Sequence, residues 1–262
     1  MNEHRLGRTG PILEGAILVT LGLAMGALIL SGNYWLYINP KFQWLTATTA
    51  GLLVLVGVAS ALQPPRPVNR SGVLIFLAFL CYTIWGNFQV LAPPPPDLLA
   101  RPTPPPPHSR EDEKARETLN GIEYIRINTG ELFNLCEDKG VDAGAHYTLQ
   151  GMVVRTPELD RAGQFVVARL AVFCCFADAV AVGFRTSDPN GRSGLKNGEW
   201  VRIYGRLEGT SNELPQPEIT FEGAVATAVH PRSVIIPEKT VPIAAPEIPF
   251  IFEFREAEPF AF

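Results

Sequence analysis

Charged residues are scarce in this sequence and are absent from long parts of its first third. Asp, Glu, Lys and Arg make up 18% of the 262 residues, whereas about a quarter is typical of soluble domains. Residues 42–62 and 72–92 contain no charged side chain, and residues 12–32 contain only Glu14, near their start. Because about 20 apolar residues in helical form cross the roughly 30 Å hydrocarbon core of a bilayer, these runs predict three transmembrane helices within residues 1–92.

A cleaved secretory signal is the alternative for the first run. Arg5 and Arg8 precede it, as in a signal peptide, but its length exceeds the apolar core of about 7–15 residues that such peptides have. The run also contains Gly22 and Gly26, at a spacing that lets helix backbones approach closely in lipid. We therefore expect the first run to be a retained helix, and the second run repeats the small-residue spacing.

Basic residues near the helix ends predict the orientation. With three spans, the N-terminal tail and the 63–71 loop share one side and carry four arginines, whereas the opposite side has only Lys41 and Arg101 close to a span. The N-terminus is therefore expected in the cytoplasm, and everything after residue 93 on the outer side of the membrane.

The sequence also lacks the residue patterns of common enzymes. It contains no Ser/His/Asp set, paired carboxylate motif or phosphate-binding loop, which predicts that the protein is not an enzyme. From His108 to the end there are 16 Lys and Arg against 23 Asp and Glu, and this acidic balance opposes binding of nucleic acid. The predicted spans contain no charge beyond Glu14, which disfavours a self-sufficient transporter.

Proline dominates the segment that follows the third predicted span. Nine of the fifteen residues 93–107 are proline, and such stretches prefer extended polyproline II because proline lacks the amide donor and fixes φ. We interpret the segment as a semi-rigid stalk, with a proline-motif docking site for a partner as the alternative. Residues 108–120 are crowded with both charge signs and predict a short solvated helix, so that 93–121 forms a linker.

From residue 122 the hydrophobic pattern alternates with a period of two, which is typical of β-strands. The pattern and its Gly, Asn, Asp and Pro interruptions predict five strands, at residues 147–155, 164–176, 180–184, 199–207 and 218–229. Five short strands favour an all-β domain over residues 122–237, a barrel like the oligonucleotide/oligosaccharide-binding (OB) type. A β-sandwich fragment is the alternative. Residues 238–262 form a phenylalanine-rich tail, expected to pack along the barrel or to contact a partner.

Alternation along two strands predicts which side chains point inward. In the long strand Val166, Ala168 and Leu170 share a wholly apolar face with Val172 and Cys174, and we expect this face to form the core. In the 199–207 strand, the apolar Val201, Ile203 and Leu207 alternate with aromatic and basic side chains.

Three cysteines belong to the predicted outer domain, where disulfides can persist. Adjacent Cys174 and Cys175 are the most unusual local feature, and Asp178 follows them closely. If these residues continue a strand, the two thiols leave opposite faces and share a metal only where the strand bulges. Three interpretations stay open at this point: a buried structural Cys174, a disulfide to Cys136, or a metal or redox site that includes Asp178.

Several segments resemble a bacterial family of small permease subunits, the YcgQ-like family. The resemblance rests on Gly163–Arg169 followed by Cys174–Ala179, and further on Tyr37–Phe42, Gly151, Trp200-Val201, Gly205 and Pro231–Pro237. Many members have a histidine where Asn39 stands here and a His-containing loop between the second and third helices. Residues 63–69 contain no histidine, so a metal or proton role at those positions is not carried over.

The resemblance implies a partner and a location: such subunits are thought to work beside a larger multi-span permease in the lipid bilayer. We therefore expect an accessory membrane subunit of a two-component permease. A membrane-tethered module for a metal or small ligand, and an assembly or scaffold protein of a membrane complex, are the alternatives. The family signature also keeps both cysteines and the following turn together. We accordingly hypothesise a metal site formed by Cys174, Cys175 and Asp178 for a soft divalent ion, with Arg169 favouring the Cys175 thiolate.

Overall fold

The computed structural model describes residues 10–64, 115–139, 142, 144–188, 191 and 194–262. The chain divides into two compact units, residues 1–104 and 105–262, and each is described by itself. Within the described part of the first unit, two helices are long and apolar enough to cross a membrane, rather than the three that the sequence predicts. The third predicted span at 72–92, with Cys81, and the proline-rich 93–107 lie outside the described residues.

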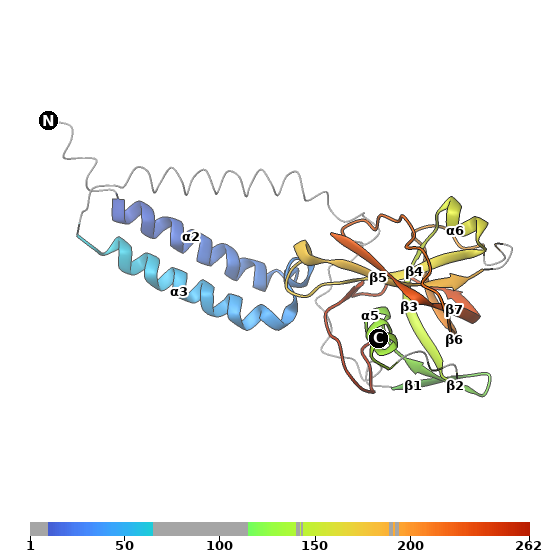
Figure 1. Ribbon diagram of the computed structural model, residues 1–262. Coiled ribbons are helices and arrows are strands. Elements are labelled where there is room, and N and C mark those ends of the chain that lie inside the picture. Colours follow the sequence, from blue (N-terminus) through green and yellow to red (C-terminus); the bar gives the residue numbers. More distant parts are fainter. Residues whose placement is uncertain (1–9, 65–114, 140–141, 143, 189–190, 192–193) are drawn as a thin grey trace. The chain divides into compact units, whose positions relative to one another are not determined.

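Two antiparallel helices, α2 and α3, form the described part of the first unit (Figure 1). Helix α2 spans Gly10–Leu30 and α3 spans Gln43–Ala61, with the 3-10 turns η1 (Tyr34–Leu36) and η2 (Pro40–Phe42) between them. Asn39 is buried, and its side-chain oxygen caps η2 by accepting the Lys41 amide. This residue therefore has a structural role in the connection.

Small residues seven positions apart form the seam between the helices. A Cβ atom on Gly15 would collide with the Gly57 carbonyl oxygen, and one on Gly22 would lie 2.7 Å from the Ala50 carbonyl oxygen. A seven-residue repeat keeps a seam facing its partner helix along two helices that cross at a small angle. The close approach expected at Gly22 is thus observed, with Ala50 as its partner. The predicted four-residue spacing was wrong, because Gly26 makes no close approach to α3 and the other close contact joins Gly15 and Gly57.

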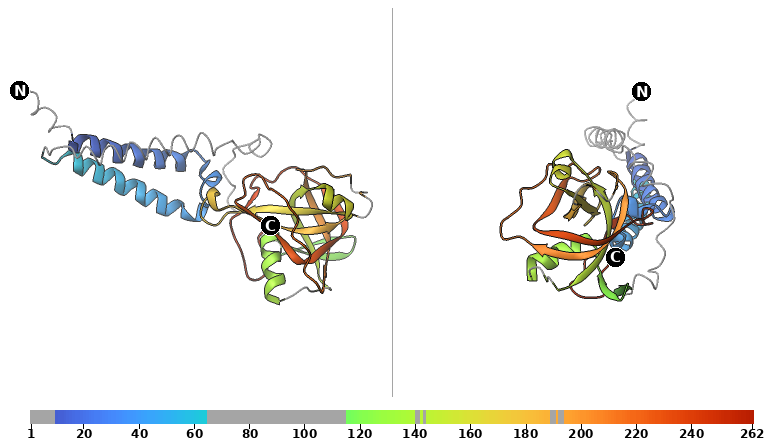
Figure 2. Two further views of the ribbon diagram at one scale, coloured as in Figure 1. Left: turned by 45° about the horizontal axis from the view of Figure 1, so that its top comes forward. Right: turned by 90° about the vertical axis from the view of Figure 1, so that its right-hand side faces the viewer.

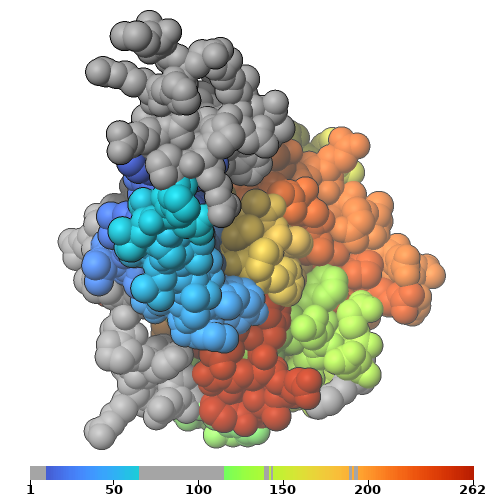
Figure 3. Space-filling view, turned by 90° about the vertical axis from the view of Figure 1, so that its left-hand side faces the viewer, coloured from blue at the N-terminus to red at the C-terminus, as the bar shows by residue number. Residues whose placement is uncertain are grey.

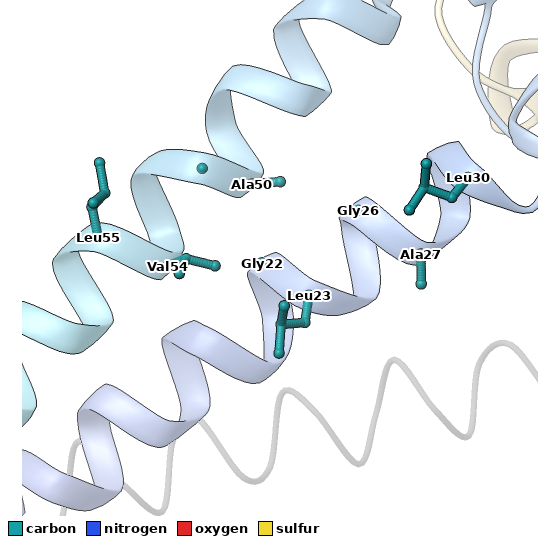
Figure 4. Close-up of a pocket in the computed structure, with 9 residues that line it drawn as sticks. Gly22, Leu23, Gly26, Ala27, Leu30, Ala50, Val54 and Leu55 are labelled. Atoms are coloured by element: carbon teal, nitrogen blue, oxygen red, sulfur yellow. The ribbon is translucent and has the colours of Figure 1, made fainter.

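Gly26 and Gly51 lie off this seam, and no atom of the described residues comes within 4 Å of a Cβ added at either position. They line an apolar groove of about 580 Å³ between the helices, together with Leu23, Ala27, Leu30, Val54, Leu55, Gly22 and Ala50 (Figure 4). The groove is open because the two small residues leave no side chain to fill it.

The outer surfaces of both helices are apolar and exposed. Leu23, Leu30 and Leu55 are among the exposed side chains, with Ile12, Leu13, Leu21, Trp44, Leu45, Leu52, Val56 and Val58. Exposed apolar side chains around a helix are compatible with a lipid environment.

A closed five-stranded β-barrel is the centre of the second unit (Figures 1 and 2). Its strands are β3 (His146–Val154), β4 (Gln164–Ala171), β5 (Val180–Ser187), β6 (Trp200–Gly209) and β7 (Ala226–Pro242). The pairings run β3–β4–β5–β7–β6 and return to β3. The β5–β7 pair is parallel and the other four are antiparallel.

The predicted strands exist, but two of their boundaries were wrong. The long strand ends at Ala171, not at 176, and the fifth begins at Ala226 and continues to Pro242. The segment 210–225 is a loop that packs back on the barrel: the Arg185 guanidinium donates to the Pro215 carbonyl oxygen, and the Gln216 side chain donates to Val229. The residues at 218–225, which the alternating pattern assigned to the fifth strand, belong to this loop.

Residues 116–119 are a strand, which contradicts the prediction of a helix at 108–120. Strands β1 (Arg116–Leu119) and β2 (Ile122–Arg126) form a hairpin with Leu119 opposite Ile122. Asn120 and Gly121 connect them and both have positive φ, as the two-residue turn of a hairpin requires. The Asn-Gly pair was the signal that the charge-based interpretation overlooked.

Helix α5 (Thr129–Lys139) was also absent from the prediction and contacts strands β3, β4 and β5. Asn128 begins it, because its side-chain oxygen accepts the Glu131 amide at 2.9 Å, as an N-cap does. Leu132 and Cys136 of this helix join the core cluster inside the barrel. The short helix α6 (Pro157–Arg161) lies between β3 and β4.

The prediction for the core face of β4 was correct for Val166, Ala168 and Leu170, which are buried, but wrong for Cys174, which is exposed, and it missed the second buried face. Phe165 and Val167 belong to the central cluster with Phe184, Val201, Ile203 and Leu207. Val166, Ala168 and Leu170 are buried too, on the opposite face. Both faces of β4 are therefore covered, and an all-apolar face does not by itself identify the interior. The prediction for Val201, Ile203 and Leu207 is confirmed.

Candidate metal centre

The two adjacent cysteines lie in the turn between β4 and β5, not in a strand. The turn comprises residues 172–179 and contains the 3-10 helix η3 (Phe176–Asp178). Because β4 ends at Ala171, the alternation that would send the two thiols to opposite faces no longer applies. Cys174 is exposed and Cys175 is partly buried.

Asp178 organises the backbone of this turn. Its two carboxylate oxygens accept the amides of Phe173 at 3.0 Å and Cys174 at 2.8 Å, and its own amide donates to the Cys175 carbonyl oxygen at 3.0 Å. Each carboxylate oxygen can accept more than one hydrogen bond. The side chain therefore closes the turn and still offers lone pairs toward the thiols.

Two thiols and one carboxylate converge in the turn. The Sγ atoms of Cys174 and Cys175 are 3.5 Å apart, and these atoms and an Asp178 carboxylate oxygen all lie within 4.8 Å of one another. Thiolates with a carboxylate are a ligand set that suits soft or borderline divalent ions such as Zn²⁺. The structure thus brings together all three residues predicted to form the site, without a strand bulge.

Hydrogen bonds shift the pKa values of the Cys174 thiol and the Asp178 carboxyl in opposite directions. A hydrogen bond to Asp178, with a further one to Cys175, raises the pKa of the Cys174 thiol to about 12. Partial desolvation works against ionisation of Asp178, but hydrogen bonds from the Cys174 thiol and from nearby amides outweigh it and lower the pKa of this carboxyl. At neutral pH the turn therefore holds an ionised carboxylate that accepts a hydrogen bond from the protonated Cys174 thiol.

The structure also shows the surroundings of Cys136 and Arg169, the other residues that the sequence analysis connected with this site. Cys136 is a free, buried thiol on α5 whose pKa burial raises to about 11; Cys174 and Cys175 are free as well. Cys174 is exposed, so the interpretation as a buried structural cysteine is wrong. Arg169 is buried and donates to the carbonyl oxygens of Ile248 and Phe250, so the guanidinium is engaged with backbone rather than with the turn.

Aromatic side chains that the sequence argument did not connect to the site surround it. Phe173 stacks on Phe254 with ring centroids 5.5 Å apart and planes 3° from parallel, and Phe176 contacts Phe250 at 5.7 Å. Phe176 also fills the space beside Gly223, where a Cβ would lie 2.6 Å from its ring. The alternation of Phe250, Phe252 and Phe254 in the tail was the available signal for this packing.

Comparison with known proteins identifies one family for this part of the chain. Residues 113–227, which include β1 to β6 and the start of β7, match the DUF1980 C-terminal domain. No curated protein matches the sequence. Among solved structures, the asparaginyl-tRNA synthetase of Entamoeba histolytica in complex with asparaginyl-adenylate is similar over 46% of this chain, with 14% identity and a TM-score of 0.26. The chain covers 24% of that enzyme's length.

Proposed function

We propose that this protein is a membrane-tethered metal-binding module whose β-barrel captures a soft divalent ion at the 172–179 turn. The observation that carries the proposal is the convergence of Cys174, Cys175 and Asp178 ligand atoms within 4.8 Å on an accessible turn. The two apolar helices of the first unit would supply the membrane tether.

The residues present fit such an ion. Two thiolates and a carboxylate provide three ligands and three negative charges, and a tetrahedral ion would take its fourth ligand from solvent or from a partner. Binding would displace the Cys174 thiol proton, and the ion would compensate the charge of the thiolate that forms. A site with one open position suits reversible capture and transfer more than permanent structural binding.

Titration of the full-length protein in detergent micelles with Cd²⁺ tests this function. We expect one ion per chain, seen as thiolate-to-metal charge-transfer absorption. Because the raised pKa of Cys174 keeps its thiol protonated at neutral pH, binding must displace that proton. The apparent affinity should therefore rise at least about tenfold per pH unit between about pH 6 and 8, and fall as the pH is lowered. Absence of saturable binding at the higher pH would rule the function out.

We also propose where this module works: as an accessory subunit of a two-component permease, with a larger multi-span permease as its partner. Two observations support it. The sequence resembles small permease subunits around Cys174–Ala179, and the apolar groove at Gly26 and Gly51 has room for the side chains of another helix. Small residues at a helix surface are what membrane helices pack against. Co-purification of a large permease in mild detergent would support this role, and isolation of a metal-loaded protein alone would contradict it.

The barrel itself is inferred to be OB-like. The ring order β3–β4–β5–β7–β6, with its parallel β5–β7 pair, is what supports the inference. OB folds are five-stranded Greek-key barrels. In this barrel the loop 210–225, between β6 and β7, packs against Arg185 of β5.

For the orientation, we propose a cytoplasmic N-terminus and a barrel outside the bacterial inner membrane, as the arginine distribution predicts. A single cysteine replacing Ser187, in a chain otherwise free of cysteine, should react with a membrane-impermeant maleimide in intact cells whose outer membrane, where there is one, has been opened. Ser187 lies at the end of β5 and is partly exposed. Protection of this site until the inner membrane is broken would reverse the proposed topology.

A further inference from the structure

The C-terminal tail, residues 243–262 after β7, packs on the segment that presents the two thiols. Its strand β8 (Phe250–Ile251) pairs in parallel with Leu170 and Ala171 at the end of β4. The next residue of the turn, Val172, donates its amide to the Ile251 carbonyl oxygen at 2.9 Å. The tail therefore extends the sheet where the metal-binding turn leaves it.

Aromatic contacts continue this packing on both sides of the cysteines. Phe254 stacks on Phe173, which precedes Cys174, and Phe250 contacts Phe176, which follows Cys175. In the space-filling view the gold residues of the turn lie next to the red residues of the tail (Figure 3). Asp178 thus fixes the turn from within, and the tail holds it from outside.

The tail is in turn fastened to the body of the barrel. The Glu131 carboxylate on α5 accepts the amides of Arg255 at 2.7 Å and Ala261 at 3.1 Å. Phe254 lies against Gly130, where any Cβ would displace its ring. At the far end, the Arg126 guanidinium lies 4.2 Å from the centre of the Phe262 ring. These contacts give the tail a defined position rather than a loose association.

We propose that the tail positions the metal site, so that docking of the tail and binding of the ion are thermodynamically coupled, with Phe254 as the positioning residue. This inference rests on the proposed metal-binding function. A ligand set held in its binding conformation loses less conformational freedom on binding, which increases affinity. Coupling between two events is reciprocal, so the ion should also strengthen docking of the tail.

Cd²⁺ titration of the full-length protein in micelles tests the proposal with two variants. Phe254→Ala should bind Cd²⁺ about three- to tenfold more weakly, since a stacked aromatic pair contributes on that order. The stoichiometry and the charge-transfer band at saturation should not change, because all three ligands remain. Phe262→Ala is the matched control: it also removes one phenyl ring from the tail, at the end that contacts Arg126 and Arg202. Its affinity should stay within about twofold of the natural chain, because Phe262 contacts neither the turn nor the residues that the turn packs against.

Unchanged affinity in Phe254→Ala, or equal weakening in both variants, would overturn the assignment. Failure of the natural chain to bind Cd²⁺ would instead overturn the metal-binding function itself. Should Phe254→Ala fail to fold, hydrogen exchange of the natural chain decides the question. Saturating Cd²⁺ should slow exchange of the Arg255 and Ala261 amides, which donate to Glu131, and exchange that is the same with and without Cd²⁺ would exclude the coupling.

Discussion

Replacing Cys175 by serine is expected to reduce Cd²⁺ affinity by at least about a hundredfold and to remove the charge-transfer absorption of that ligand. A hydroxyl is a hard, protonated group that replaces a soft thiolate, and two residual ligands on one turn leave most of the coordination sphere to water. Asp178→Asn should weaken binding less than Cys175→Ser. It keeps one side-chain oxygen that can accept an amide of the turn, but loses the carboxylate charge.

Cys136→Ala is the matched control for a cysteine outside the turn. Its thiol is buried on α5 within the core cluster, so its loss should leave Cd²⁺ affinity and stoichiometry unchanged while lowering the melting temperature slightly. Thiol counting before titration confirms the number of reactive cysteines. Retention of full affinity in Cys175→Ser, or its loss in Cys136→Ala, would contradict the assignment of the site.

Substitution of a glycine in the helix seam and of a glycine in the groove should have opposite effects on the α2–α3 hairpin. Gly57→Leu should break the α2–α3 hairpin, because even a Cβ at this position would lie 2.7 Å from the Gly15 carbonyl oxygen. Membrane helices associate through such close backbone packing. Val19 lies beside Gly57 and Val54 lies beside Gly22 across the seam. Cysteines introduced in place of Val19 and Val54 should cross-link efficiently in the natural background and poorly in Gly57→Leu.

Gly26→Leu is the matched counterpart, since its position has open space around it. The hairpin should form and cross-link normally. The leucine should fill the groove, however. If the proposed permease partner binds there, its co-purification should fall by about tenfold or more, as expected from overpacking of a helix interface. Normal recovery of a partner with Gly26→Leu would exclude the groove as its contact surface. Normal cross-linking in Gly57→Leu would exclude close packing of α2 and α3 at Gly57.

The parts of the fold that follow from local patterns were predictable from the sequence. Long uncharged runs indicated the helices that became α2 and α3. Alternation with turn residues between located β3, β5 and β6 to within three residues and the start of β4 correctly, but misplaced the end of β4 and both ends of β7. These signals are strong because each depends on residues adjacent in the chain. Even so, Asn120-Gly121 carried a clear hairpin signal that was overridden by the charge pattern around it.

Other features depend on contacts between distant residues. No local pattern indicates that β4 is covered on both faces, that β7 begins eight residues later than its alternation suggests, or that Gly57 meets Gly15. The candidate site shows both situations. Its three residues were recognisable because they are close in sequence, but their convergence follows from where β4 ends, and the aromatic packing by residues 250–254 comes from a segment some eighty positions away.

Strand β7 determines when the barrel of the second unit can close during synthesis of the chain. This strand pairs with β5 on one side and with β6 on the other, so it is the last strand of the ring to be synthesised and the one that closes it. Until Pro242 has emerged, β5 and β6 both present unpaired edges, which are templates for association with other chains. Folding also depends on pairings between segments far apart in the sequence, and such topologies fold slowly. A chain interrupted between β6 and the end of β7 would therefore have most of its core residues but no closed barrel, and is the form of this protein most prone to aggregate.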